Sequence, residues 1–103
     1  MANMNCFIGI DVGTGSARAG VFGSDGAMLG SAKREIAIFK GSGDIVEQSS
    51  ENIWAAICAS VHEALIISGV SADAIKGIGF DATCSLVVLD QNYEPLSVSP
   101  SGD

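Results

Sequence analysis

Short apolar runs separated by small and polar residues dominate the first forty positions of the chain. The run from Phe7 to Asp11 is typical of a buried strand, and the run from Ala17 to Phe22 has the same character. The sequence GSDG at positions 23–26 predicts a tight turn, and Met28 to Phe39 predicts a long third strand. Together these segments predict a three-stranded antiparallel meander.

A helical period begins after the loop KGSGD, Lys40 to Asp44. Ser49 is a suitable N-cap, Glu51 suits the positive end of the helix dipole, and Gly69 stands where a C-terminal glycine belongs. We expect Trp54 to lie in the core. The apolar positions with helical spacing are Trp54, Cys58, Val61 and Leu65, with Ile53 and Ile57 beside them.

Two more segments, Ile75 to Asp81 and Ser85 to Asp90, predict further strands, whereas the tail from Pro95 shows no pattern. The sequence therefore predicts an α/β fold. With 103 residues, a chain can bury roughly two-thirds of its unfolded surface. Apolar residues make up 48% of the chain and charged residues 17%. We expect part of this apolar surface to be covered by chain outside the given sequence.

The formal net charge is −7, with basic residues at Arg18, Lys33, Arg34, Lys40 and Lys76. Five scattered cations form no basic stripe, so we expect no nucleic-acid partner. Three cysteines in apolar runs form no disulfide framework, which indicates a reducing compartment. The sequence shows neither a signal peptide nor a membrane-length apolar run, and it predicts a cytoplasmic protein without a membrane partner.

The most informative chemistry lies between the first two strands. Asp11 precedes a loop of four small residues, and Arg18 follows it; the loop consists of Gly13, Thr14, Gly15 and Ser16. In one interpretation, the glycines are turn residues that need a positive φ. In the other, backbone N–H groups and hydroxyls form an anion site, and Asp11 holds a divalent cation beside the anion. The second interpretation predicts Mg²⁺ and a nucleotide phosphate.

Other glycine motifs fit less well. A Walker loop requires a lysine that is lacking here. The sequence GIGFDA at 77–82 matches a dinucleotide fingerprint, but that fingerprint must open a helix, and strand-type residues follow. A Rossmann fold is therefore disfavoured.

The segment FIGIDVGTGSARAGVF resembles the first phosphate-binding hairpin of the actin, sugar-kinase and Hsp70 superfamily, whose domains are ribonuclease H-like. Together with DIVEQSSENIW at 44–54 and GIGFDATCSLVVLD at 77–90, it resembles the FGGY carbohydrate kinases. The resemblance runs along essentially the whole sequence. It implies that residues 1–103 are the first part of kinase domain I, with the C-terminal domain and the catalytic base beyond Asp103.

The resemblance also implies roles for individual residues. Asp11 would hold Mg²⁺, residues 13–16 would face the phosphates of ATP, and Arg18 would lie close to them. The residues expected at the sugar are Glu47, Asp81, Ala82, Thr83 and Cys84. Two alternatives stay open: Glu47 as an exposed acidic residue before a helix, and Asp81 as a cap of local N–H groups.

Other reactive side chains are assigned no catalytic role. His62 lies off the apolar stripe and is expected in solvent. Cys84 is expected to be a packed or cleft-lining thiol rather than a nucleophile, because no histidine is placed to activate it.

The implied activity is phosphorylation of a sugar hydroxyl by ATP. Xylulose kinases typically carry Gln-Met-His after the strand that corresponds to Ile75 to Asp81. This chain has Asp81-Ala82-Thr83-Cys84-Ser85 there, a pattern that resembles ribulokinases. We therefore expect a pentulose such as ribulose as the substrate, and no activity from this chain alone. Homodimer formation stays open. The alternatives are a non-catalytic nucleotide- or sugar-binding module and an Hsp70-like or actin-like ATPase.

Overall fold

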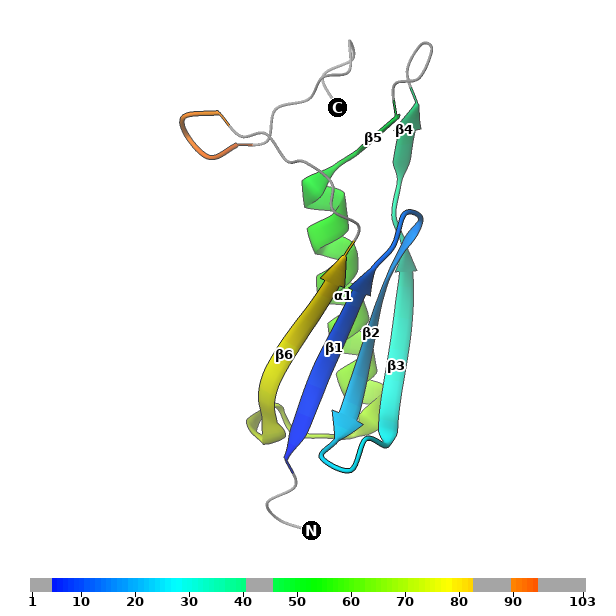
Figure 1. The fold of residues 1–103 in the computed structure, drawn as a ribbon, viewed down its shortest axis with the longest axis vertical. Helices are drawn as coiled ribbons and strands as arrows, with labels where there is room; N and C mark the ends of the chain where they lie inside the picture. The colour runs from blue at the N-terminus through cyan, green and yellow to red at the C-terminus, as the bar shows by residue number, and fades with distance from the viewer. Residues whose placement is uncertain (1–4, 41–45, 83–89, 95–103) are drawn as a thin grey trace.

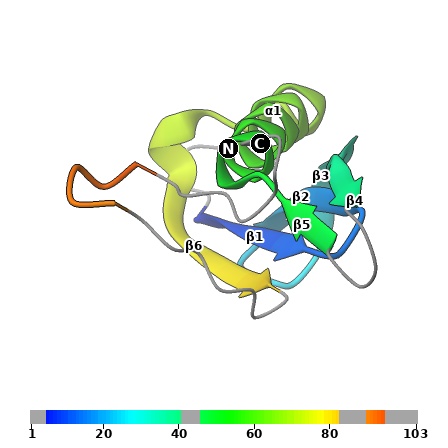
Figure 2. The ribbon, with the colours of Figure 1, turned by 90° about the horizontal axis from the view of Figure 1, so that it is seen from above.

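The computed structural model describes residues 5–40, 46–82 and 90–94. A four-stranded sheet has the order β3-β2-β1-β6, and a single long helix, α1, packs on one of its faces (Figures 1 and 2). The strands are β1 (Cys6–Val12), β2 (Ser16–Gly23), β3 (Met28–Glu35) and β6 (Ile75–Ala82). The predicted α/β class is confirmed.

The first three strands form the predicted antiparallel meander. The GSDG turn between β2 and β3 has Gly26 at φ +88°, and Asp25 Oδ1 accepts a hydrogen bond of 3.0 Å from the N–H of Ala27. Strand β6 joins the other side of β1 and runs parallel to it. The chain reaches β6 through α1 and a short 3₁₀ helix, η1 (Ala72–Ala74). The carboxyl ends of β1 and β6 therefore meet at the same edge of the sheet.

The prediction of one strand from Met28 to Phe39 is wrong. Strand β3 ends at Glu35, and β4 (Ile38–Lys40) pairs with β5 (Val46–Gln48) in a separate antiparallel sheet. The N–H of Ile36 donates to Gly15 O at 2.9 Å, and the N–H of Ala37 donates to Asn52 Oδ1 at 2.7 Å. The bond from Ile36 continues the β2–β3 register by one residue. The chain leaves the main sheet at Ala37, because its N–H is committed to a side chain of α1 and cannot extend the ladder.

Helix α1 (Ser50–Ser68) begins and ends where the sequence predicts. Ser49 is the N-cap, with its Oγ accepting a hydrogen bond of 3.2 Å from the N–H of Asn52. Gly69 closes the helix at φ +70°. His62 is exposed, as predicted.

The prediction that Trp54 lies in the core is wrong: its side chain is 61% exposed, and Cys58, one turn later, is also exposed. The face of α1 that packs on the sheet consists of smaller residues, namely Ala56, Ile57, Ser60 and Ala64. Small residues occupy this face because the helix lies close to the sheet. A Cβ built on Gly30 of β3 would lie 2.7 Å from Ser68 N and 2.8 Å from Ala64 O.

Substitution of Gly30 by alanine is expected to destabilise the chain by about 2 kcal/mol, because the new methyl group meets backbone atoms of α1 that cannot move independently. Urea unfolding followed by circular dichroism measures this loss. Gly79 is a matched control, since a Cβ there meets no atom within 4 Å. Equal stabilities of G30A and G79A would contradict the close packing.

Helix α1 leaves part of its own side of the sheet uncovered. It packs mainly on β2 and β3, while Ile78 and Phe80 of β6 are 56% and 61% exposed. The buried core lies between α1 and the centre of the sheet; its members include Ile8, Ile10, Val21 and Ile57. Within the described residues, no helix is long and apolar enough to cross a bilayer.

The last predicted strand, Ser85 to Asp90, falls almost entirely on residues 83–89, which lie outside the described residues. The same holds for Gly41 to Asp44 of the predicted loop, whereas Lys40 belongs to β4.

Candidate functional site

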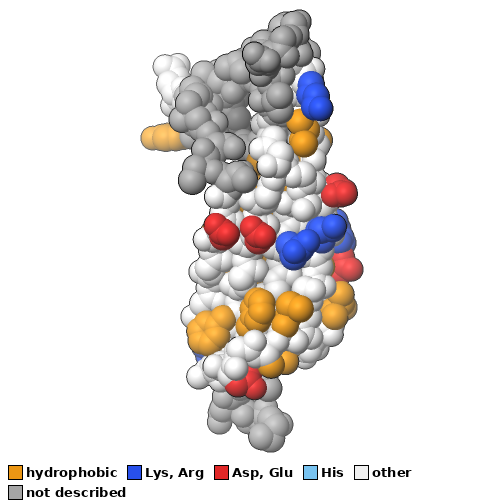
Figure 3. All heavy atoms as spheres, turned by 45° about the vertical axis from the view of Figure 1, so that its right-hand side comes forward, with side chains coloured by type: hydrophobic (Ala, Val, Ile, Leu, Met, Phe, Trp, Pro, Cys, Tyr) orange, Lys and Arg blue, Asp and Glu red, His pale blue; other side chains and the backbone are white. Residues whose placement is uncertain are grey.

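The face of the four-stranded sheet away from α1, which we call the open face, carries a row of four charges. Asp11 pairs with Asp81 on one side and with Arg18 on the other, and Arg18 pairs with Lys33. Paired residues in neighbouring strands point to the same face. Figure 3 shows the result as two acidic and two basic patches side by side. Within the described residues Arg18 forms no ion pair with Asp11, so its charge is available to an anion.

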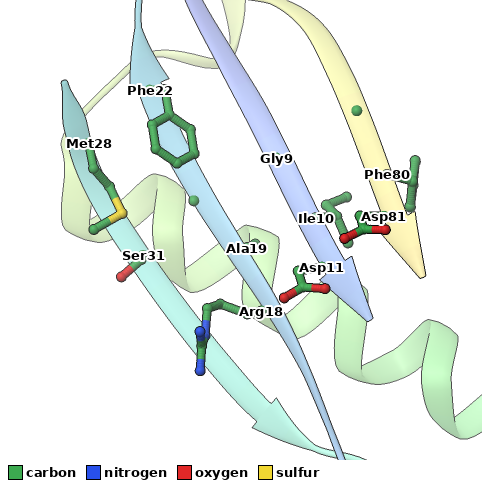
Figure 4. A pocket seen from close by; sticks show the side chains of 12 residues that line it. Gly9, Ile10, Asp11, Arg18, Ala19, Phe22, Met28, Ser31, Phe80 and Asp81 are labelled. Atoms are coloured by element: carbon green, nitrogen blue, oxygen red, sulfur yellow. The ribbon is translucent and has the colours of Figure 1, made fainter. Parts of the chain in front are cut away.

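Two further rows complete the open face below the charges. Gly79, Gly9, Gly20 and Ser31 form a row of small residues, and Phe7, Phe22 and Met28 form an apolar row. The ring of Phe22 lies over Gly20, where a Cβ would be 2.8 Å from Cε2. The small row leaves an open hollow of about 680 Å³ that reaches Asp11, Arg18 and Asp81 (Figure 4).

The loop of residues 13–16, which we call the glycine loop, connects β1 to β2 at the charged end of the hollow. The N–H of Gly13 donates to Ser16 O at 2.9 Å. Two other carbonyl groups of the loop are also held: Gly15 O accepts from Ile36 N, and Thr14 O accepts from the Gln48 side-chain amide. In the described part of the chain, the N–H groups of Thr14 and Gly15 have no acceptor. Thus the loop is fixed through its carbonyls while two amide donors stay free.

The glycines of this loop are not needed for its backbone conformation. Among the described glycines only Gly26 and Gly69 have positive φ, so the interpretation of Gly13 and Gly15 as positive-φ turn residues is wrong. A Cβ on Gly15 would meet nothing within 4 Å, and one on Gly13 would lie 3.7 Å from Ser16 O. The fold itself therefore tolerates side chains at both positions.

The structure brings several predicted site residues together. Asp11, Arg18 and Asp81 line one hollow, and Ala82 lies beside Val12 at the end of β6. The described residues contain no group of three or more His, Cys, Asp or Glu side chains able to hold a metal ion. Asp11 and Asp81 form a neighbouring pair.

The other predicted sugar-cleft residues are described less fully. Glu47 lies in β5, where its backbone pairs with Phe39. Thr83 and Cys84 lie outside the described residues.

Two residues of the site were not predicted from the sequence. Lys33 joins the charged row through its register with Arg18, and Gln48 contacts the glycine loop from 34 positions away. The sequence marks Lys33 as a basic residue in a strand, but its neighbour depends on the pairing register. No local pattern indicates the contact of Gln48.

Comparison with known proteins places this geometry in a family. Residues 6–99 match the N-terminal domain of the FGGY family of carbohydrate kinases. A human FGGY carbohydrate kinase domain-containing protein is 44% identical over 97 residues, which cover 94% of this chain and 17% of that protein. A D-ribulokinase of Saccharomyces cerevisiae is 45% identical over 95 residues, which cover 91% of this chain and 13% of that protein.

A solved structure shares the same arrangement. The crystal structure of a xylulose kinase from Brucella ovis superposes with a TM-score of 0.83 at 20% identity, over 90% of this chain and 20% of that chain. At this identity the likeness shows the fold alone. The chain spans less than a fifth of the length of the two curated relatives, 17% of one and 13% of the other. With residues 6–99 matched and relatives 44% and 45% identical, the chain belongs to the FGGY family of carbohydrate kinases.

Proposed function

We propose that this chain supplies the first phosphate-binding loop and one wall of the sugar cleft of a kinase that transfers a phosphoryl group from ATP to a pentulose. Family membership supports the reaction class, and the D-ribulokinase relative supports ribulose as the acceptor. The glycine loop supplies the binding chemistry.

Two features of the glycine loop carry this proposal: it has amide groups without acceptors among the described residues, and it has a glycine at position 15 that the fold does not require. Thr14 and Gly15 present N–H groups without acceptors in the described part of the chain, and a Cβ built on Gly15 meets no described atom within 4 Å. Adjacent backbone N–H groups form a site for phosphate oxygens, and glycine lets the phosphate approach closely. The hydroxyls of Thr14 and Ser16 add donors.

The carboxylates fit a magnesium ion that accompanies the nucleotide. Mg²⁺ prefers oxygen ligands and is commonly held by one or two carboxylates together with phosphate oxygens and water. Asp11 meets this requirement, with Asp81 beside it. The bound ion would neutralise charge on the phosphates. Arg18, exposed on the open face, adds a fixed positive charge for the same anion.

The sugar is proposed to bind at the carboxyl end of β6, next to the glycine loop. Open α/β sheets place ligands beyond the carboxyl ends of their strands. Asp81 and Ala82 end β6, and Thr83 and Cys84 follow them in sequence. Glu47 of β5 is proposed to reach the sugar hydroxyls from the other sheet. Closure of a second domain over this wall would exclude water and limit hydrolysis of ATP.

A chimera tests the proposal. In it, residues 6–99 replace the equivalent N-terminal segment of the S. cerevisiae D-ribulokinase, which is 45% identical. We expect ADP release that depends on ribulose, and little turnover with xylulose. A chimera that unfolds cooperatively, like the parent enzyme, but releases no ADP with ribulose would contradict the proposal.

The 103-residue chain alone is expected not to phosphorylate ribulose, because phosphoryl transfer also needs an oriented nucleophile and further phosphate contacts. Measurement of ADP release by the purified chain, with and without ribulose, tests this expectation. Release that depends on ribulose would show that the remaining machinery lies within these residues. A chain that binds nucleotide or sugar while its chimera stays inactive would favour a non-catalytic binding module.

A further inference from the structure

We infer that Gln48 is a positioning residue that aims the Gly15 N–H at the nucleotide phosphates; the inference rests on the proposed function. Gln48 ends β5 and directly precedes Ser49, the N-cap of α1. Its side-chain amide donates a hydrogen bond to the carbonyl oxygen of Thr14 in the glycine loop.

The geometry of the peptide bond converts this contact into control of a donor. Thr14 C=O and Gly15 N–H belong to one planar peptide unit, and the described residues contain no cis peptide. In a trans unit the C=O and the N–H point in opposite directions. By holding the carbonyl on its own side, Gln48 turns the Gly15 N–H to the other side. A hydrogen bond at the carbonyl also polarises the unit and strengthens the N–H as a donor.

A second bond fixes the next peptide unit in the same manner. Gly15 O accepts from Ile36 N at 2.9 Å, which orients the N–H of Ser16. The adjacent Ala37 N–H is held by Asn52 Oδ1 in the first turn of α1. That part of the loop is therefore anchored by backbone, whereas the Thr14–Gly15 unit depends on the Gln48 side chain.

Gln48 is itself well placed for this task. Its backbone pairs with Ile38 on β4, and the capped helix begins two residues later. The backbone of Gln48 is therefore held by β4 and by the start of α1 without help from the glycine loop.

The test compares variants of the chimera. Gln48→Glu removes the donor, keeps the shape and places a carboxylate against Thr14 O; we expect KM for ATP to rise about five- to tenfold. Gln48→Met removes the donor without charge and serves if the first variant does not fold; we expect about a threefold rise or more. Gln48→His keeps an N–H donor at similar reach and is expected to stay within about twofold of the parent.

If Gln48 served only to stabilise the fold, its substitution would lower Tm and raise the KM for both ATP and ribulose. We expect KM for ribulose and the Tm of Gln48→Glu to stay close to the parent values. Gln91→Glu, the same change at an exposed position, is the matched control and should alter nothing. A KM for ATP unchanged in Gln48→Glu and Gln48→Met overturns the inference. So does a rise of both KM values together with a lower Tm.

The outcome also separates this inference from the proposed function. Suppose that the parent chimera uses ATP and that Gly15→Ala lowers its kcat/KM for ATP. Gln48 variants with an unchanged KM for ATP would then overturn the positioning role alone and leave the proposed function intact. If the parent chimera folds but does not use ATP, both the function and the role of Gln48 are overturned.

Discussion

Substitution of Asp11 by asparagine is expected to lower kcat of the chimera with ribulose about 10²- to 10³-fold. The change keeps the size of the side chain but removes the charge proposed to hold Mg²⁺ beside the phosphates. Loss of one preorganised electrostatic contact of this kind typically costs this much in rate. Initial rates at saturating ATP and ribulose, measured over a series of Mg²⁺ concentrations, test the expectation.

The control for this prediction is Asp73→Asn, which removes the same charge from an exposed position in η1. It is expected to leave kcat within about twofold of the parent, because screened surface charges contribute little at this distance. A similar, small effect of D11N and D73N would remove Asp11 from the proposed metal site. The two variants should have similar Tm values, since Asp11 is exposed and not part of the core.

The second large effect is expected from Gly15→Ala, and it should separate function from stability. The new methyl group meets no atom within 4 Å and no positive φ, so stability should stay equal or rise by up to about 1 kcal/mol. In the same variant kcat/KM for ATP should fall at least about tenfold, because the methyl group stands where a phosphate oxygen must approach the backbone. Steady-state kinetics and thermal unfolding measure the two effects.

Gly26→Ala provides the opposite pattern. Gly26 has φ +88° in the turn between β2 and β3, away from the glycine loop, so alanine there should cost about 1 kcal/mol of stability. Its kcat/KM for ATP should match that of the parent. If Gly15→Ala were instead to destabilise the protein and keep normal kinetics, the glycine at 15 would be a folding requirement.

Local signals in the sequence predicted the elements that position the site. The ends of α1 follow from Ser49 and Gly69, and the hairpin at Gly26 follows from its turn sequence. Each of these depends on backbone preferences of a few neighbouring residues. The glycine loop also has a local signature, because its four small residues are contiguous in the sequence and follow Asp11 closely.

Features that depend on distant contacts could not be predicted in this way. The break after β3 arises because the N–H of Ala37 donates to the side chain of Asn52, which is far away in the sequence. The periodicity of α1 was also ambiguous, since apolar residues surround most of the helix. The close approach at Gly30 selects the small-residue face and leaves Trp54 outside.

The candidate site shows the same division. The sequence indicates Asp11, Arg18 and Asp81 separately, but their alignment in one charged row depends on strand register across β2, β1 and β6. A side chain from another strand, such as Gln48, reaches the glycine loop through tertiary structure alone. The functional residues of one short segment can therefore be predicted from the sequence. Their orientation cannot, because it depends on contacts with other segments.

The central claim is that the free amides of the glycine loop bind the phosphates of ATP. A crystal structure of the chimera with Mg²⁺ and a non-hydrolysable ATP analogue measures this directly as the distance from Gly15 N to the nearest phosphate oxygen. We predict a hydrogen bond of about 2.7–3.2 Å. A bound nucleotide whose phosphates lie elsewhere, with the Gly15 N–H facing only solvent, would contradict the account.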